Sequence, residues 1–431
     1  MKMLNIIHCF PPESMSGSEI YAYNLSKELS KSHDISIFYR INDRSRKNYE
    51  LVKGNYDGLS VYKVNNILNR YTTLENIYKN KNIEDIFIKV LDEVKPDIVH
   101  IHHLLFLSLG IIDIIKERNI PIVFTLHDYW LMCPRGQLLK PNSRLCSDPV
   151  NSNCLYCLIS GMSPSNISRK IFTFSIPRKI SKRYNVELSE VFDKVDLFIA
   201  PSKFLRNRFI ELGMPQGKIR YSDYGMNADL FKDIKKTLSD KVRFGFIGTL
   251  IPTKGVHVAI KAFNKIEESN VMLKIYGKPP VNNGIFSYYK KIKRIVRGNK
   301  NIYFMGSFDN KDIAKVFKDI DVLIFPSMWE ENSPLILHEA ILSNTPILAS
   351  KVGGVSELIK DSFFLFERGN VEELYNKIKF FIDNSDKLNE HNPAVTTVKD
   401  IKEDAVEIEK IYSLLVKRQE TIDSKVLTKI L

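Results

Sequence analysis

No apolar run in the chain reaches the roughly 18 residues that a bilayer-spanning helix requires. The longest run extends from Leu104 to Ile112, is interrupted by Ser108, and is flanked by His103 and Asp113. The opening segment MKMLNIIHCFPP lacks the apolar core of about 7–15 residues found in secretory signals, and we interpret it as a first strand. We therefore expect a cytoplasmic protein.

Internal repeats with a period of roughly 20–50 residues and low-complexity tracts are also absent, which excludes solenoid and collagen-like chains. The chain is 44% apolar and 26% charged, which is ordinary for a folded globular protein. Its net charge of +13 comes without an RNP, zinc-finger or basic-zipper signature, so nucleic acid is not an expected partner. The excess positive charge predicts attraction to an acidic membrane surface or a phosphorylated substrate.

Cysteine is scarce, and four of the five cysteines fall in one Pro- and Asn-rich segment. A C-x(2)-C pair preceded by two further cysteines can provide a tetrahedral thiolate site, and a long loop would gain stability from such a metal. We favour a structural zinc ion, with thiols that bind no metal, an iron–sulfur cluster or a disulfide as alternatives. The ligands would be Cys133, Cys146, Cys154 and Cys157.

Short apolar strands alternate with turns and helical patterns along both halves of the chain. This order is typical of parallel sheets that are covered by helices on both faces. The length suits an α/β protein with two domains of roughly 200 residues each. Helices are expected at 256–263, 311–318, 334–342 and 398–416, and the polar segment 223–241 is the expected connection. The strand candidates are 4–8, 34–39, 97–102, 122–126, 197–200, 243–248, 273–277, 301–306, 321–326 and 345–350.

The segment MWEENSPLILHEA carries two glutamates, Glu331 and Glu339, in an E-x(7)-E pattern. Ser333 and Pro334 are typical of an N-cap and a first helical residue, so Glu331 should lie just before a helix and Glu339 inside it. A strand leads directly into this loop, and open α/β sheets bind ligands at the carboxyl ends of strands. Backbone N–H groups at a helix start suit phosphate, and here Asn332, Ser333 and Leu335 would provide them. The alternative is two surface glutamates at a chance spacing.

Two glycine motifs also follow strands in the second half. In GTLIPTKG, Gly248 allows close backbone approach and Lys254 offers a positive charge to a diphosphate. In KVGGVSELI, Gly353 and Gly354 predict a tight turn before a helix. Each motif taken alone is equally typical of an ordinary helix entry.

Together and in this order, GTL-x(3)-KG, the E-x(7)-E helix and the GGVxE turn resemble the retaining glycosyltransferases of family 4. The resemblance covers nearly the whole chain and implies a GT-B fold, with two Rossmann-like domains whose parallel sheets face a cleft. It implies an acceptor-binding domain at 1–225, with a cysteine-rich insertion at about 131–160. A nucleotide-sugar-binding domain would cover 226–397, and a C-terminal helix at 398–431 would pack back on the first domain.

The resemblance also implies roles for the second-half residues. Lys254 would hold the donor diphosphate, with Gly248 and Thr249 beside it; Thr249 stands where the family often has arginine. Glu339 would bind the ribose hydroxyls, since a carboxylate accepts two hydroxyl donors. Glu331 would lie beside the transferred sugar, and we favour electrostatic stabilisation of an oxocarbenium-like charge over a nucleophilic role.

In the first half, the family's phosphate-binding glycine pair is matched by Ser16 and Gly17, of which Gly17 is kept. His127 and Asp128 match a His–Asp pair at a strand end, with His127 expected as a catalytic residue and Asp128 on the acceptor side. His102 and His103 also end a strand and are expected on the acceptor side. For all four, structural packing or solvation is the alternative.

The implied activity is that of a retaining hexosyltransferase-type enzyme (EC 2.4) that requires no cofactor for catalysis. It would move sugar from a nucleotide diphosphate sugar, with UDP or GDP as the expected nucleotide, to a glycan or lipid-linked acceptor in cell-surface polysaccharide or glycoconjugate synthesis. A GT-B nucleotide-sugar epimerase and a catalytically silent nucleotide-sugar-binding protein are the alternatives. A glycan phosphorylase would need a pyridoxal-phosphate lysine, for which no motif is present.

Two basic clusters, at 163–185 and 288–300, hold much of the excess positive charge. Basic segments with apolar residues between them can lie on anionic lipid. We therefore expect the protein to lie on the inner face of an anionic membrane. The same two clusters point to an acceptor that is phosphorylated or held in the membrane. The alternative is a pair of solvated lysine-rich helices.

Overall fold

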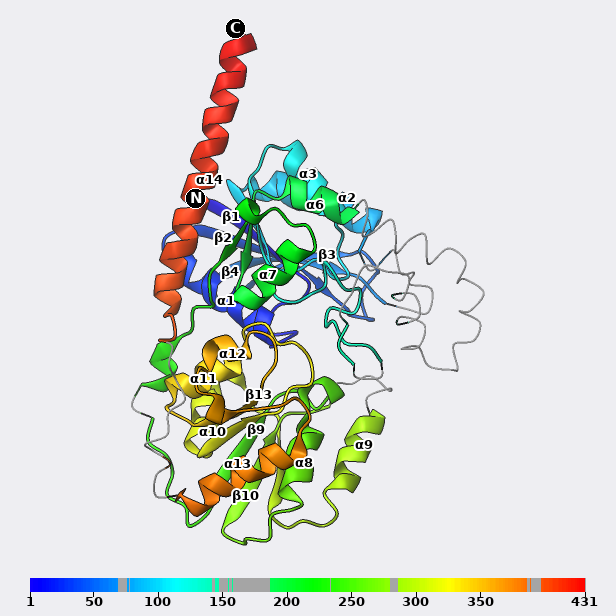
Figure 1. Cartoon of the computed structure of the whole chain (residues 1–431). Coiled ribbons are helices and arrows are strands. Elements are labelled where there is room, and N and C mark those ends of the chain that lie inside the picture. Colours follow the sequence, from blue (N-terminus) through cyan, green and yellow to red (C-terminus); the bar gives the residue numbers. More distant parts are fainter. Residues whose placement is uncertain are drawn as a thin grey trace. The chain divides into compact units, whose positions relative to one another are not determined.

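The structure is a computed structural model. It describes residues 1–68, 76, 78–141, 144–146, 154, 157, 187–232, 234–279, 286–385, 388 and 397–430. The chain divides into two compact units, seen in Figure 1. We call Met1–Gly136, Asp148–Gly225 and Lys399–Leu431 the N-terminal unit. The C-terminal unit consists of Gln137–Ser147 and Met226–Val398.

The N-terminal unit is built on an eight-stranded sheet in the order β3-β4-β2-β1-β5-β6-β7-β8, which is parallel except for the β3–β4 hairpin. The central strands are buried along their length, as expected for apolar runs in a parallel sheet that is covered on both faces. The predicted strands all form, and the hairpin and β8 are additional. The strands are β1 (Lys2–Ile7), β2 (Asp34–Ile41), β3 (Leu51–Tyr56), β4 (Leu59–Asn65), β5 (Ile98–Ile101), β6 (Ile122–Thr125), β7 (Leu197–Ala200) and β8 (Ile219–Tyr221).

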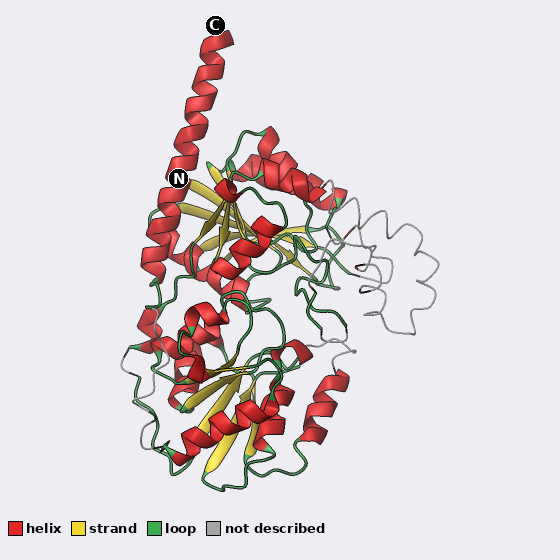
Figure 2. Ribbon diagram, viewed as in Figure 1, coloured by secondary structure: helices red, strands yellow, loops and turns green. Residues whose placement is uncertain are grey.

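Helices cover both faces of this sheet (Figure 2). Helix α3 contacts both α2 and α6, and α1 contacts α14, whose far end runs past the sheet in Figure 1. The helix predicted at 398–416 is longer, since α14 extends to Ile430. The helices are α1 (Gly17–Leu29), α2 (Lys81–Val94), α3 (Gly110–Glu117), α6 (Leu188–Lys194), α7 (Lys203–Glu211) and α14 (Ile401–Ile430), with short 3-10 helix η4 (Gln216–Lys218).

The C-terminal unit has a six-stranded, fully parallel sheet in the order β11-β10-β9-β12-β13-β14. Its apolar core lies between the sheet and helices that include α8 and α13. The strands are β9 (Val242–Ile247), β10 (Val271–Tyr276), β11 (Ile302–Gly306), β12 (Val322–Phe325), β13 (Ile347–Ser350) and β14 (Leu365–Phe366). The α-helices are α8 (Val256–Phe263), α9 (Phe286–Ile295), α10 (Ile313–Lys318), α11 (Leu335–Leu342), α12 (Val355–Leu358) and α13 (Val371–Asp383). The 3-10 helices are η5 (Ala228–Phe231), η6 (Pro252–Lys254), η7 (Asn310–Asp312) and η8 (Ser362–Phe364).

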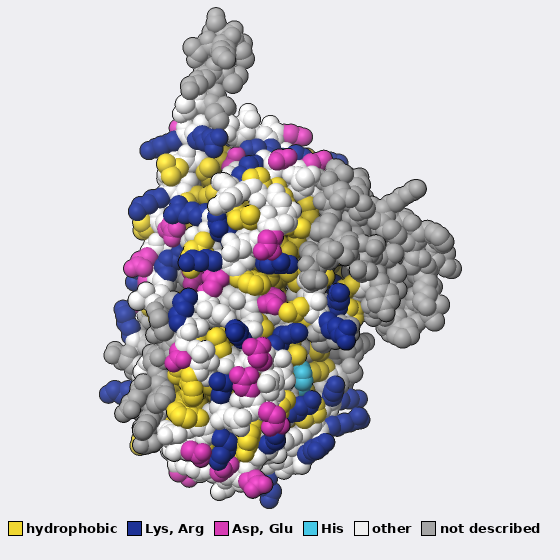
Figure 3. Space-filling model, viewed as in Figure 1, with side chains coloured by type: hydrophobic (Ala, Val, Ile, Leu, Met, Phe, Trp, Pro, Cys, Tyr) yellow, Lys and Arg dark blue, Asp and Glu magenta, His cyan; other side chains and the backbone are white. Residues whose placement is uncertain are grey.

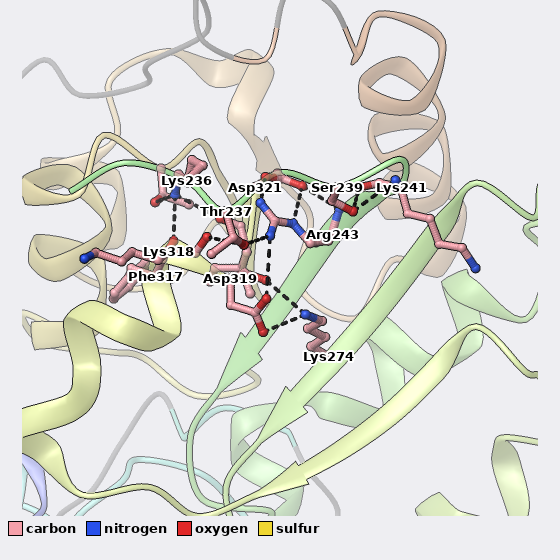
Figure 4. Close-up of polar contacts among 12 residues, drawn as sticks. Lys236, Thr237, Ser239, Lys241, Arg243, Lys274, Phe317, Lys318, Asp319 and Asp321 are labelled. Carbon is pink, nitrogen blue, oxygen red and sulfur yellow. Dashed lines mark hydrogen bonds and ion pairs between the residues drawn. The ribbon is translucent and has the colours of Figure 1, made fainter.

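A polar network closes the amino-terminal edge of the C-terminal sheet (Figure 4). Buried Arg243, at the start of β9, donates from Nε and Nη2 to both carboxylate oxygens of Asp321, at 2.9 and 2.6 Å. Lys236 Nζ donates to the carbonyls of Phe317 and Ile320, both at 2.9 Å, and burial lowers the Lys236 pKa to about 8. The network therefore fixes the polar segment that follows the unit boundary, at the edge opposite the carboxyl ends of the strands.

Candidate active site

Lys254 and Glu331 are 77 positions apart in sequence and meet at the carboxyl ends of β9 and β12. Lys254 Nζ lies 2.8 Å from Glu331 Oε1, and the same oxygen accepts from Ser327 Oγ and Trp329 Nε1, both at 2.7 Å. Glu331 is buried, and its Oε2 accepts no hydrogen bond from the described residues. One carboxylate oxygen is thus held by three donors while the other remains available.

A glycine brings the lysine to this position. Gly255 has φ +72°, and a Cβ placed there would lie 1.7 Å from the carbonyl oxygen of Pro326, so only glycine fits. Met328 N donates to the carbonyl of Thr253 at 2.7 Å. The turn that carries Lys254 is therefore packed directly against the loop that carries Glu331.

The Gly353–Gly354 turn holds the same loop from another direction. Gly354 N donates to the carbonyl of Glu331 at 2.8 Å, and Gly353 N donates to the side chain of Glu330. A Cβ on Gly353, which has φ +50°, would lie 2.0 Å from the Glu331 carbonyl oxygen. The three motifs that were singled out in the sequence thus converge on the backbone and side chain of Glu331.

Glu339 lies within α11, buried, and its carboxylate has no hydrogen bond or ion pair with the described residues. Burial raises the pKa of Glu339 to about 8. The predicted N-cap was wrong: α11 begins at Leu335 with Pro334 in the cap position, while Ser333 Oγ lies 2.8 Å from His338 Nε2.

The remaining donor-side residues lie at this same edge of the sheet. Asn332 and Ser333 lead, buried, into the start of α11, and Gly248 directly follows β9. The backbone N–H of Gly248 is already used, since it donates to the carbonyl of Tyr276 at 3.0 Å. Thr249 accepts from Ile251 N at 2.9 Å through its carbonyl.

Histidines gather at the carboxyl ends of β1, β5 and β6 in the N-terminal unit. His102 Nδ1 lies 3.1 Å from His127 Nε2, and His103 Nε2 lies 3.4 Å from Asp128 Oδ2. All four predicted acceptor-side and catalytic residues of this unit are therefore brought together. The ring of His8, which the sequence analysis did not select, lies 4.5 Å from that of His103.

Burial holds His8, His102 and His127 uncharged. Burial, with the neighbouring histidines, lowers the pKa of His8 and His127 well below 6.5, and burial lowers the pKa of His102 to about 3. Proton transfer at neutral pH is therefore not their natural role, whereas hydrogen bonding to hydroxyl groups is.

The start of α1 adds a buried carboxylate to this region. Gly17 is the first residue of α1, and Glu19 accepts from Ser14 Oγ at 3.0 Å and Ser18 Oγ at 2.8 Å. Glu19 Oε1 also lies 3.5 Å from His8 Nε2. Glu19 and His8 were missed, although His8 ends a predicted strand just as His102 and His127 do.

The four cysteines are the predicted ligands of a structural zinc ion. Among the described residues, which include all four, no group of three or more His, Cys, Asp or Glu is placed to hold a metal ion. Cys133 N donates to the carbonyl of Tyr129, whereas Cys146 N donates to that of Leu138, in a segment that groups with the C-terminal unit. Cys133 and Cys146 therefore lie in separate local turns, and the zinc site of Cys133, Cys146, Cys154 and Cys157 stays a prediction.

Of the two basic clusters, 163–185 lies outside the described residues, while 288–300 includes most of α9. Within the described ranges, no helix combines the length and the apolar character needed to span a bilayer.

Two parallel-sheet α/β units, one with a Lys–Glu pair at its strand ends, define a glycosyltransferase of the GT-B fold. The chain belongs to glycosyltransferase family 4. Residues 15–229 match the family model described as Glycosyltransferase Family 4, and residues 228–395 match Glycosyl transferases group 1. The predicted family, fold and enzyme class are thereby confirmed, and the chain is a glycosyltransferase of the hexosyltransferase type.

Relatives and solved structures agree with this assignment. An uncharacterized 42.6 kDa protein in the cps region of Klebsiella pneumoniae is 23% identical over 90% of this chain and 95% of its own. The lipopolysaccharide 1,2-N-acetylglucosaminetransferase of Salmonella typhimurium is 23% identical over 86% of this chain and 86% of its own. Anabaena HepE in complex with UDP-glucose superposes with a TM-score of 0.63 at 18% identity, covering 98% of this chain and 100% of its own. Together these matches support glycosyltransferase activity with nucleotide sugars.

Proposed function

We propose that the enzyme transfers a hexose, with retention of configuration, from a nucleotide diphosphate sugar to a glycan or lipid-linked acceptor. The relatives named for a cps region and for lipopolysaccharide synthesis support a role in cell-surface polysaccharide or glycoconjugate assembly. HepE, solved with UDP-glucose, makes a UDP-sugar the first donor to test, ahead of a GDP-sugar.

The Lys254–Glu331 contact is the observation that carries this proposal. Without a donor, the Lys254 charge is compensated by Glu331 at 2.8 Å, and an arriving diphosphate offers the lysine a stronger anionic partner. Glu331 would then keep its bonds from Ser327 and Trp329 and remain in place beside the transferred sugar. Glu339, buried without a partner in the described part of the chain, would accept the two ribose hydroxyls.

The donor set on Glu331 favours a stabilising role over a nucleophilic one. Three donors already occupy Oε1 and hold the carboxylate in one orientation, so bond formation from this oxygen to the sugar carbon is disfavoured. Its negative charge instead offsets the oxocarbenium-like charge that develops as the bond from C1 to the phosphate oxygen breaks. The acceptor oxygen forms the new C1–O bond on the same face, and its proton passes to the departing diphosphate. His127, held neutral and bonded through both ring nitrogens, would lie beside the sugar without acting as the base.

A donor panel tests the proposal. UDP-, GDP- and ADP-sugars are compared by thermal shift and by turnover with candidate acceptors, because a bound donor stabilises the fold. We expect one donor class to raise the unfolding temperature in the native enzyme and in Lys261→Met, but not in Lys254→Met. Lys261 is a matched control because it is exposed on α8, in the same unit. Neither binding nor turnover with any donor would refute the proposal, and full donor affinity in Glu339→Ala would remove the ribose assignment.

We further propose that the enzyme acts in the cytoplasm and touches the inner face of the membrane through α9. Residues 286–300 contain six Lys or Arg and no acid, and Lys291 and Arg294 are exposed while Ile292 is buried in the core. Figure 3 shows Lys and Arg side chains gathered over this part of the unit. Anionic lipid attracts such a surface.

Sedimentation with phosphatidylglycerol vesicles tests the membrane contact. Lys291→Glu with Arg294→Glu should weaken binding, whereas Lys318→Glu with Lys360→Glu should not. The control lysines are exposed in the same unit, outside α9. Equal binding by both double variants would rule out α9 as the contact.

A further inference from the structure

Both ring nitrogens of His127 are already engaged. Nδ1 lies 2.6 Å from the hydroxyl oxygen of Tyr224, and Nε2 lies 3.1 Å from His102 Nδ1. The rings of Tyr224 and His102 stack on that of His127, with centroids at 5.6 and 5.4 Å, and Tyr21 meets it edge-on at 5.7 Å. The imidazole therefore has one orientation, with each nitrogen matched to a separate partner.

The direction of these bonds follows from the chemistry of the phenol. A phenolic O–H is a good donor, so Tyr224 donates to Nδ1 and the His127 proton resides on Nε2, where it is donated to His102. His102 is fully buried, and its own Nε2 has no hydrogen-bond partner among the described residues. The hydroxyl of Tyr224 thus determines the proton positions of a chain of two histidines.

We propose that Tyr224 is a positioning residue for His127: its hydroxyl fixes the orientation of the imidazole and keeps the proton on Nε2. The importance of this for catalysis rests on the proposed function, which places His127 beside the substrates. The sequence motifs gave Tyr224 no role, because it stands in the polar segment 223–241, which was expected only to connect the two domains.

A buried carboxylate of α14 holds the backbone that carries Tyr224. Asp404 Oδ2 accepts from the N–H of Gly225 at 3.1 Å and from the Tyr21 hydroxyl at 3.0 Å, while Lys399 Nζ lies 2.7 Å from Oδ1. A Cβ on Gly225 would lie 2.5 Å from that of Asp404, so the two segments could not be closer. Tyr224 therefore approaches His127 from a fixed point.

The titratable groups around His127 come from several elements. His8, His102 and His103 follow β1 and β5, Tyr21 belongs to α1, and Asp128 is the next residue in the chain. A positive charge on His127 is disfavoured by its burial and by His102, His103 and His8 beside it. Without the Tyr224 hydroxyl, Nδ1 loses its donor, and the ring is able to place its proton on either nitrogen.

Nitrogen NMR of 15N-labelled histidine rings tests this directly, with His127 assigned by its loss in His127→Gln. We expect the native protein to show one neutral tautomer of His127, protonated at Nε2, from pH 5.5 to 8. Tyr224→Phe should give a mixture of tautomers. Tyr412→Phe is the matched control, because Tyr412 is a buried tyrosine whose hydroxyl lies 2.5 Å from Nδ1 of a different histidine, His100. It should leave His127 unchanged.

Activity gives a second readout. Tyr224→Phe should lower kcat about three- to tenfold, the loss typical of one hydrogen bond, with the donor KM unchanged. Incorporation of 3-fluorotyrosine at position 224 keeps the shape with a stronger donor, so it should preserve the single tautomer even if the phenylalanine variant unfolds. The positioning role would be overturned if the ring-nitrogen chemical shifts of His127 in Tyr224→Phe equalled those of the native protein. It would also be overturned if Tyr412→Phe gave the same mixture of His127 tautomers as Tyr224→Phe. Full transfer by His127→Ala would instead overturn the proposed function of His127.

Discussion

At the scale of single residues, Glu339 is the most unusual group in the donor half. Burial raises its pKa to about 8, so most of the molecules carry it protonated at pH 7. Two ribose hydroxyls require the ionised form as their acceptor. Because the native pKa lies above the unfolded value of about 4.5, the ligand-free protein loses stability as the pH rises toward 8.

Nucleotide affinity should therefore increase with pH. Between pH 6.5 and 8.5 the ionised fraction of a carboxyl with a pKa of about 8 rises roughly 20-fold, so we expect UDP to bind about 20-fold more tightly. Calorimetry in buffers of different ionisation enthalpy should show proton release on binding at pH 7. Glu339→Gln removes the titration and should bind weakly with no dependence on pH. An unchanged pH profile in that variant would assign the dependence to another group.

The Lys254–Glu331 ion pair is expected to serve both the stability of the fold and the binding of the donor. Lys254→Met leaves a buried carboxylate without its cation and should cost about 1–3 kcal/mol of unfolding free energy in urea. The double variant with Glu331→Gln should recover most of that stability, because no buried charge remains. Donor affinity should stay low in both variants. Recovery of donor binding in the double variant would contradict a direct contact of Lys254 with the diphosphate.

At the scale of elements, the glycine before α8 fixes where a charged group stands. Gly255→Ala would place a Cβ 1.7 Å from the Pro326 carbonyl oxygen at φ +72°, whereas Gly298, at φ +75°, has nothing within 4 Å. Both alanine variants share the strain of a left-handed residue, about 1 kcal/mol, and only the first adds a clash. We expect Gly255→Ala alone to lose donor affinity, as measured by thermal shift. Equal losses in both variants would mean that backbone strain, not the clash, is responsible.

Most strands of both sheets could be predicted because each of these is a short apolar run bounded by turns, and burial on both faces requires that composition. The short strands β8 and β14, of three and two residues, were missed. The β3–β4 hairpin was missed because β3 is partly or fully exposed along its length and carries no apolar run. Its signal was the Asp57–Gly58 pair, whose positive φ values of 48° and 84° suit a tight hairpin turn. The start of α11 was misplaced by one residue because Pro334 has an extended backbone, with ψ 117°, so it takes the cap position and the helix begins at Leu335.

The functional importance of Lys254 and Glu331 could be predicted from the order of the sequence motifs that carry them. The partners of His127 could not be predicted in this way. Tyr224 lies 97 positions after His127 in the chain, and Asp404 belongs to the C-terminal helix α14. In the sequence, Asp404 is one acid on a helix with an apolar face, and nothing local marks it as buried. Long-range contacts of this kind depend on how α14 packs against α1, which periodicity alone does not specify.

At the scale of the whole molecule, the buried histidines link folding to pH. Burial lowers the pKa of His102 to about 3, and those of His100 and His127 also fall well below 6.5. Below pH 6.5 the unfolded chain binds protons that the native protein cannot, so stability is complete above that pH and is lost as the pH falls.

A single such group costs about 2 kcal/mol at pH 5 relative to pH 7, from 1.36 kcal/mol for each pKa unit. Urea unfolding at the two pH values should show at least that loss in the native protein. His102→Gln cannot titrate and should reduce the pH dependence by about 2 kcal/mol, even though it lowers stability at both values.

His257→Gln is the comparison, because burial lowers the pKa of His257 only to about 4 and it lies in the other unit. If unfolding of the N-terminal unit is followed separately, by its own fluorescence or proteolysis signal, only His102→Gln should change its pH dependence. An identical response to both substitutions would show that the acid sensitivity does not originate in the histidine cluster.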